Sequence, residues 1–351
     1  MSLSVQNEKK EWISKAKGFG ILGVVAVHTV QRFSVSTYLS CIAYAGMYCV
    51  QLFFVISAYL TFVSLENNLK QLTLRTYLKY FGHKLVRLVP ILYTAVLWHI
   101  LNRSVLMGKV PEINASIWKD AFFALTFLNG FSYRHINPWA NWYIGDLVIF
   151  WAVSPLLFRW INSPKKSVWF FVVTMLFGWL SYKILHWFGV DTSWFFYFWF
   201  PRQLPVLAIG IMFYHFQKYP FGDSKKSIRT LAFVVSVCLL LSFFYTTPME
   251  LHVRYGLFLL VFVYTLFNYS GKWFNWLKVL GDNSYGIYLY HVCLITVFDT
   301  IVRRYDINSV SVTNFVGYYI LLILISLLIS IIANMVFEKP FFRFMRRKFG
   351  V

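Results

Sequence analysis

Apolar segments of about 20 residues recur along the whole chain of 351 residues, and each is long enough to cross a bilayer as an α-helix. Hydrophobic residues make up 59% of the chain and charged residues only 13%, and the mean hydropathy is +0.60. A soluble domain of this length needs far more charge to cover its surface. The alternating segments of about ten residues that are typical of a transmembrane β-barrel are absent. The sequence therefore predicts an all-α polytopic membrane protein.

Ten segments are predicted to span the membrane and to form one membrane domain over residues 1–351. Their approximate ranges are 18–33, 42–63, 87–106, 142–160, 167–188, 203–217, 229–246, 253–269, 283–302 and 313–337. The segment 115–131 is shorter and more polar at its start, so we expect an interfacial or re-entrant piece. The polar N-terminal segment 1–17 is followed by no small-residue cleavage site, so we expect the first apolar run to remain a spanning helix.

Lysines and arginines gather in alternate loops. With the N-terminus in the cytoplasm, 23 of the 33 cations fall on the cytoplasmic side, which predicts both ends inside and a basic cytoplasmic tail over 338–351. The net charge of +20 is then mostly a property of that face, where it suits anionic lipid headgroups. The cations are scattered over many short loops, which argues against nucleic-acid binding. No internal repeat is evident, unlike in inverted-repeat transporters.

Ionisable side chains inside spanning segments are costly, so each is a candidate functional group. The stretch KGFGILGVVAVHT begins at Lys17 and reaches His28 eleven residues later. At about 1.5 Å of rise per residue the two side chains lie roughly 16 Å apart along one helix. Lys17 then lies near a membrane face and His28 deep inside. His28 is either a structural histidine or a general base, because an imidazole accepts protons near neutral pH.

Two cations and a proline mark the start of the third span, in FGHKLVRLVPILY. Lys84 and Arg87 are spaced i, i+3 and share one helical face. We expect Pro90 to break or tilt the helix and to free backbone groups for a ligand. The two cations either anchor lipid headgroups or form a clamp for a phosphate-bearing ligand.

Polar side chains also stand at the ends of three other spans. Trp142 opens the fourth span as an interfacial aromatic residue or a site residue, and Asp146 is a candidate partner for a histidine or a sugar hydroxyl. Glu338 closes the tenth span among basic residues, which suits a salt bridge. In GDNSYGIYLYHVCLI a hydroxyl, a phenol and an imidazole recur at i, i+4 and i+7 and should face the bundle interior: Ser284, Tyr288 and His291. The four cysteines have no metal-ligand spacing, and no metal site is expected.

Together these motifs resemble the membrane-bound acyltransferase family 3. Six blocks occur in the family's order and span most of the chain: Lys17 and Gly18 with His28, VQLFFVISA over 50–58, Lys84 with Arg87 and Pro90, Trp142 with Pro155, SYGIYLYH over 284–291, and Glu338 to Phe341. Four positions depart from the pattern. Lysine replaces arginine at Lys17 and Lys84, Gln51 replaces an acid, and Ala58 replaces a glycine.

The resemblance implies transfer of an acyl group, usually acetyl, from cytoplasmic acyl-CoA to a carbohydrate hydroxyl. Acyl-CoA is then a substrate, and no permanently bound cofactor is expected. The acceptor is expected to be a bacterial surface polysaccharide or its lipid-linked precursor (O-antigen of lipopolysaccharide, capsule or exopolysaccharide), modified at the cytoplasmic (inner) membrane. A lysine lacks the bidentate phosphate grip of arginine, which leaves the type of donor open.

For such a reaction we hypothesise roles for the residues named above and for Arg202. Lys17, Lys84 and Arg87 bind acyl-CoA, and His28 acts as the general base or carries the acyl group transiently. The remaining residues position the substrate, stabilise the oxyanion or support the site: Trp142, Asp146, Arg202, Ser284, Tyr285, Tyr288, His291 and Glu338. Two rival interpretations are a transporter or flippase that uses His28, Asp146 and His291, and a non-catalytic membrane scaffold.

Overall fold

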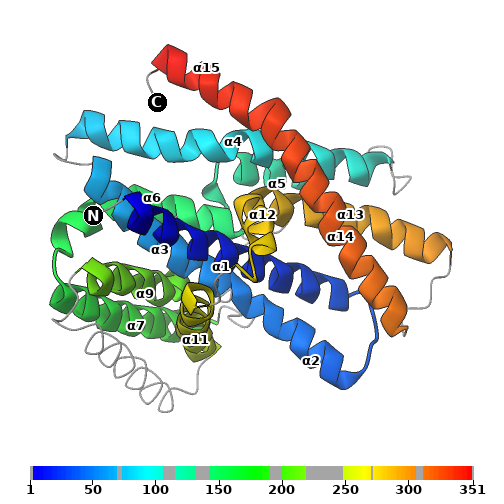
Figure 1. The fold of residues 1–351 in the computed structure, drawn as a ribbon, viewed down its shortest axis with the longest axis horizontal. Helices are drawn as coiled ribbons and strands as arrows, with labels where there is room; N and C mark the ends of the chain where they lie inside the picture. The colour runs from blue at the N-terminus through cyan, green and yellow to red at the C-terminus, as the bar shows by residue number, and fades with distance from the viewer. Residues whose placement is uncertain are drawn as a thin grey trace.

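The structure, a computed structural model, describes residues 3–68, 73–105, 115–130, 142–189, 199–218, 248–269, 272–305 and 311–349. Within these ranges the regular elements are helices, and none is a β-strand (Figure 1). Seven helical stretches of the described chain are long and apolar enough to cross a membrane. The predicted all-α, multi-pass fold class is therefore confirmed.

The helices pack as a bundle of roughly antiparallel elements (Figure 1). Short 3₁₀ turns and one π turn interrupt or connect them in the described part of the chain. Their bounds are α1 Leu3–Val30, α2 Thr37–Ala45, η1 Gly46–Tyr48, α3 Cys49–Asn68, α4 Leu74–Val105, α5 Ala115–Leu125, η2 Leu128–Gly130, α6 Trp142–Trp160, α7 Pro164–Trp187, α9 Phe200–Lys218, α11 Pro248–Tyr269, α12 Trp276–Asp282, α13 Ser284–Arg304, α14 Val312–Ala333, η4 Asn334–Glu338 and α15 Lys339–Phe349.

Most predicted spans coincide with a helix of the structure. The span predicted over 229–246 lies outside the described residues. Helices α9 and α11 occupy the predicted spans 203–217 and 253–269, but neither is among the seven stretches that meet the criteria of length and apolarity; α11 contains a shorter apolar stretch, His252–Phe267. The number of ten spans and the cytoplasmic position of both ends therefore stay predictions. The first turn of α1 and the last turn of α15 lie toward the same, left side of Figure 1.

Two helices begin several turns earlier than predicted. Helix α1 begins at Leu3 and α4 at Leu74, so Lys17, Lys84 and Arg87 lie inside helices and not at their ends. The expected break at Pro90 is wrong, because α4 continues through this residue to Val105. A proline removes one backbone donor, and in a membrane protein neighbouring side chains can compensate for the loss. The carbonyl that loses its donor is that of Val86, four residues earlier; the Thr94 hydroxyl donates to the Pro90 carbonyl at 3.0 Å and does not replace the lost bond.

The short segment predicted over 115–131 is helical in its described part. Helix α5 has eleven residues, too few to span a bilayer, and it packs beside α4. Its apolar side chains Trp118 and Phe122 are exposed. The short length of α5 suits the predicted interfacial or re-entrant piece, which stays a prediction.

Helix α13 is fixed to α4 by side-chain hydrogen bonds. The hydroxyl groups of Thr94 and Tyr290 lie 2.6 Å apart, and the Asn102 amide donates to the Cys293 carbonyl at 3.0 Å. Because apolar surroundings provide no competing water, such bonds hold the relative position of the two helices. The face of α13 that meets α4 therefore carries Tyr290 and Cys293.

Glycines let the short helix α12 lie directly on α1. A side chain at Gly18 would collide with the backbone of Leu277, and one at Gly281 would collide with the backbone of Ser14. Small residues at such crossings allow two helix backbones to approach closely. The contact places Asp282, the last residue of α12, beside Lys17.

A similar contact explains one departure from the resembled pattern. Position 58 carries Ala58 where the pattern has a glycine, and Ala58 packs against Gly210 of α9. A side chain at Gly210 would collide with the backbone of α3 at Val55. The close crossing of α3 and α9 is therefore kept by a glycine on the second helix.

Replacing Gly18 by valine should destabilise the fold, because the added methyl groups meet the Leu277 backbone. We expect a loss of about 1–3 kcal/mol in the free energy of unfolding, as for overpacked cores. Thermal unfolding of the detergent-solubilised protein measures the effect. Gly82→Ala in α4 is the matched control, since no atom lies within 4 Å of a side chain added there. Equal stability of the two variants would contradict the proposed packing.

Candidate functional site

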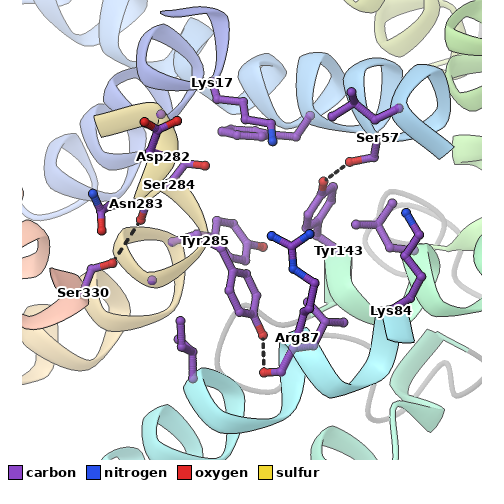
Figure 2. A pocket seen from close by; sticks show the side chains of 18 of the residues that line it. Lys17, Ser57, Lys84, Arg87, Tyr143, Asp282, Asn283, Ser284, Tyr285 and Ser330 are labelled. Carbon is purple, nitrogen blue, oxygen red and sulfur yellow. Dashed lines mark hydrogen bonds between the residues drawn. The ribbon is translucent and has the colours of Figure 1, made fainter. Parts of the chain in front are cut away.

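A cavity of about 520 Å³ opens between α1, α3, α4, α6, α13 and the end of α14 (Figure 2). Seven of the residues predicted to form the site line it: Lys17, Lys84, Arg87, Ser284, Tyr285, Tyr288 and Glu338. These residues come from α1, α4, α13 and η4, which are far apart in the sequence. The tertiary structure thus brings together most of the site that the motifs indicated.

One end of the cavity is cationic. Figure 2 shows the amino groups of Lys17 and Lys84 and the guanidinium of Arg87 pointing toward the same space. The Lys84 amino group lies 5.6 Å from the ring centroid of Trp151 and 5.7 Å from that of Tyr80, within the range of a cation–π contact. None of the three cations forms an ion pair with a carboxylate of the described residues. Their mutual repulsion favours binding of an anion between them.

Two carboxylates lie beside these cations. Asp282 is near Lys17 and accepts a hydrogen bond from the Ser14 hydroxyl at 2.7 Å. Glu338 is near Arg87 at the end of the π turn η4, and no salt bridge joins it to another described residue. A π turn widens a helix locally and often occurs at a functional site. The three cations therefore outnumber the carboxylates that line the cavity.

The other end of the cavity is aromatic and apolar. It is lined by Val50 and Phe53 of α3, Ile91 of α4, Tyr143 of α6 and Tyr288 of α13. Along α4, Lys84 at the cationic end and Ile91 at this end are seven residues apart, or about 10 Å of helix rise. A ligand with an anionic head and a long, mostly uncharged arm would match this division.

Two hydroxyl groups that the sequence motifs did not single out face the cavity. The Ser57 and Tyr143 hydroxyls lie 3.0 Å apart (Figure 2). The spacing of Tyr143, Leu147 and Trp151 at i, i+4 and i+8 could have indicated this part of the lining, because it places all three side chains on one face of α6. Sequence reasoning favoured the adjacent face instead, because it carries the charged residue Asp146.

His28 lies beyond the aromatic end and does not line the cavity. Its ring packs against the ring of His291, with 5.2 Å between the centroids. The His291 ring lies 6.0 Å from that of Tyr288, and Tyr288 lies 5.7 Å from Tyr143. A row of four rings therefore connects the cavity to His28, with Tyr288 between the cavity and the two histidines.

Three residues predicted for the site lie elsewhere. The Trp142 ring is buried inside the bundle, 5.9 Å from that of Phe54, and does not line the cavity. The Asp146 carboxylate is fully buried, does not line the cavity and accepts no hydrogen bond from a described residue, so no histidine partner is present there. Arg202 is buried near His252 in a second polar cluster.

In this second cluster His252 pairs with Gln51, one of the four residues that depart from the resembled pattern. The Gln51 amide nitrogen lies 2.5 Å from Nδ1 of His252. Both side chains are buried. An amide can donate to a neutral imidazole, so Gln51 suits a buried, uncharged partner. In the described part of the chain no three histidine, cysteine or acidic side chains are placed to hold a metal ion.

Inorganic pyrophosphate should stabilise the protein by binding between the three cations. At ten times its dissociation constant we expect about 1.4 kcal/mol of added stability. Thermal unfolding with and without pyrophosphate measures this shift. Lys84→Met should reduce it. Lys183→Met is the matched control, because Lys183 also lies over a tryptophan ring but outside the cavity. An undiminished shift in Lys84→Met would contradict the anion site.

Comparison with known proteins identifies the family of the chain. The family model of the acyltransferase domain of family 3 matches residues 10–335, and this range includes the cavity from Lys17 to Asn334. No curated protein and no solved structure matches the chain. The match covers most of the sequence and the spanning helices are apolar. The chain therefore belongs to acyltransferase family 3 and is a membrane acyltransferase.

Proposed function

We propose that this acyltransferase moves an acyl group, most commonly acetyl, from cytoplasmic acyl-CoA to a hydroxyl of a bacterial surface polysaccharide or its lipid-linked precursor. The observation that carries the proposal is the cavity. At one end it has three cations that form no ion pair with a described carboxylate, and at the other end it has an aromatic lining. Acyl-CoA is divided in the same way: its phosphates lie at one end, and its uncharged arm ends in the thioester.

The donor enters from the cationic end. Its pyrophosphate lies between Lys17, Lys84 and Arg87, and its pantetheine arm extends past Ser57 toward Tyr143 and Tyr288. Lysine contributes a point charge where arginine would give two parallel hydrogen bonds, so affinity rests on the combined field of the three cations. The predicted excess of loop cations on the cytoplasmic side supports a cytoplasmic position for this end. The thioester then lies near the aromatic end.

The acceptor enters from the opposite side. His28 stands in the last turn of α1, roughly 16 Å of helix rise from Lys17. Its imidazole takes the proton of the acceptor hydroxyl, and the oxygen attacks the thioester carbonyl. The Ser57 and Tyr143 hydroxyls are placed to donate a hydrogen bond to the carbonyl oxygen as negative charge develops on it. With acetyl as the acyl group, a protein that catalyses these steps is an O-acetyltransferase of the bacterial inner membrane.

Purified protein in lipid nanodiscs should transfer radiolabel from acetyl-CoA to a lipid-linked glycan and release free coenzyme A. Succinyl-CoA and longer acyl-CoA donors in parallel define the acyl group. Mass spectrometry of surface glycans from cells with and without the gene identifies the acceptor. Movement of glycan or protons across the bilayer without covalent labelling would favour the transporter alternative and contradict the proposal.

Replacing His28 by alanine should lower the turnover number at least a hundredfold, the usual contribution of a general base. Donor binding, measured as stabilisation by pyrophosphate, should persist because the cations lie at the other end of the cavity. Initial rates of coenzyme A release measure the effect. His186→Ala is the control, since this residue lies at the end of α7 and away from the cavity. Full activity of His28→Ala would remove the assignment.

A further inference from the structure

Outside the cavity, the helix that carries two of its cations packs against a second basic helix. Figure 1 shows α15 beside α4, and the Phe342 ring of α15 lies 5.4 Å from the His83 ring of α4, centroid to centroid. Neither helix contains an aspartate or a glutamate, whereas five of the eleven residues of α15 are lysine or arginine. Two helices of like charge repel each other, and an anion held between them would remove that repulsion.

Three basic side chains converge where the two helices meet. Arg346 comes four residues after Phe342 and lies on the same face of α15, and Lys79 comes four residues before His83 on α4. Both cations are near enough to His83 to act on it electrostatically. Both are exposed, and neither forms an ion pair with a carboxylate of the described residues. Lys79, His83 and Arg346 are called the outer cluster below.

The outer cluster continues the cationic end of the cavity. Lys79, His83 and Arg87 follow one another at i, i+4 and i+8, so they form one stripe along α4. Arg87 lines the cavity, and the outer cluster does not. The step from Arg87 to His83 is about 6 Å of helix rise. A ligand with one anionic group in the cavity can therefore reach the outer cluster with a second anionic group one helical turn away.

Coenzyme A carries its charge in two such groups. The pyrophosphate is attached to the 5′ carbon of the ribose and a further phosphate to the 3′ carbon, so a single sugar ring separates them. The 3′-phosphate is a monoester with a charge of about −2 near neutral pH and three terminal oxygens. A guanidinium donates two parallel hydrogen bonds to such a group, and a lysine adds a point charge. The outer cluster supplies one of each, together with an imidazole that can donate a ring N–H.

We propose, on the basis of the function above, that the outer cluster is the subsite for the 3′-phosphate of the acyl donor. Arg346 and Lys79 bind the phosphate oxygens from α15 and α4, and His83 donates one ring N–H to them. The donor is thereby selected as a nucleotide thioester that carries a 3′-phosphate. The same acyl group on 3′-dephospho-CoA, or on the phosphopantetheine arm of a carrier protein, lacks this phosphate and binds less tightly.

Anionic lipid headgroups share the phosphate chemistry and are the rival ligand. The other cations of α15 include Arg343 and Arg347, which are also exposed and suit such headgroups. The outer cluster differs from them because its stripe on α4 leads into the cavity at Arg87. This continuity favours the nucleotide. The experiments below therefore vary the ligand and the lipid separately.

The first test compares two ligands that differ by one phosphate. The protein in nanodiscs of zwitterionic lipid should bind coenzyme A about tenfold more tightly than 3′-dephospho-CoA, as measured by isothermal titration calorimetry. This preference should fall severalfold in Arg346→Gln and further when Lys79→Met is added, while the affinity for 3′-dephospho-CoA stays the same. Equal affinity of the wild-type protein for the two ligands would overturn the subsite.

Arg347→Gln is the matched control. It removes the same charge from the same helix, but Arg347 comes five residues after Phe342 and lies on a different face of α15. This variant should keep the preference for coenzyme A. If Arg346→Gln and Arg347→Gln instead weaken the binding of both ligands equally, the cations of α15 act only through their general field and the subsite is wrong.

Nanodiscs with anionic lipid distinguish the nucleotide from a headgroup. The preference of the wild-type protein for coenzyme A over 3′-dephospho-CoA should persist in them. Its loss would assign Lys79 and Arg346 to lipid headgroups and contradict the proposal.

Failure of the subsite differs from failure of the proposed function. If the wild-type protein transfers acetyl from acetyl-CoA and from acetyl-3′-dephospho-CoA with the same KM, only the subsite is wrong. If neither ligand binds and neither donor is used with any glycan, the proposed reaction is wrong and the subsite with it.

Discussion

The repulsion among Lys17, Lys84 and Arg87 is the physical constraint on which the site depends. Three cations point into one cavity inside a membrane protein, and no ion pair with a described residue offsets their charge. In surroundings of low polarity such a group of like charges is costly unless an anion joins it. The folded chain therefore keeps a place for a ligand that carries negative charge, and the free energy of binding compensates for the repulsion.

The helix packing maintains this arrangement. The backbone contacts at Gly18 and Gly281 hold α12 against α1, so Asp282 lies next to Lys17. On the other side, the hydrogen bond from Tyr285 to the Leu88 carbonyl, at 2.9 Å, ties α13 to the cationic turn of α4. The first two contacts depend on glycines, which have no side chain, and the third depends on a backbone carbonyl that accepts the hydrogen bond. The backbone positions from which the charged side chains extend are consequently held by helix packing.

The cavity and the histidine pair are two chemical compartments that meet at Tyr288. One compartment has cations and an aromatic lining suited to a thioester donor, and the other has a base suited to an alcohol. Keeping them apart limits the access of water to the donor while the acceptor is absent. It also explains why a histidine outside the cavity can belong to the site, as the row of rings from Tyr143 to His28 connects the two compartments.

The sequence by itself determined the membrane fold class and most of the cavity, because apolar length and the spacing of cations on one helix are local properties. Lys84 and Arg87 share a face whatever surrounds α4, and the i, i+4 spacing likewise places Ser284 and Tyr288 together. Only the tertiary structure decided that Pro90 leaves α4 unbroken, that Asp146 does not line the cavity, and that His28 pairs with His291. These outcomes depend on which helices become neighbours, and long-range packing decides that.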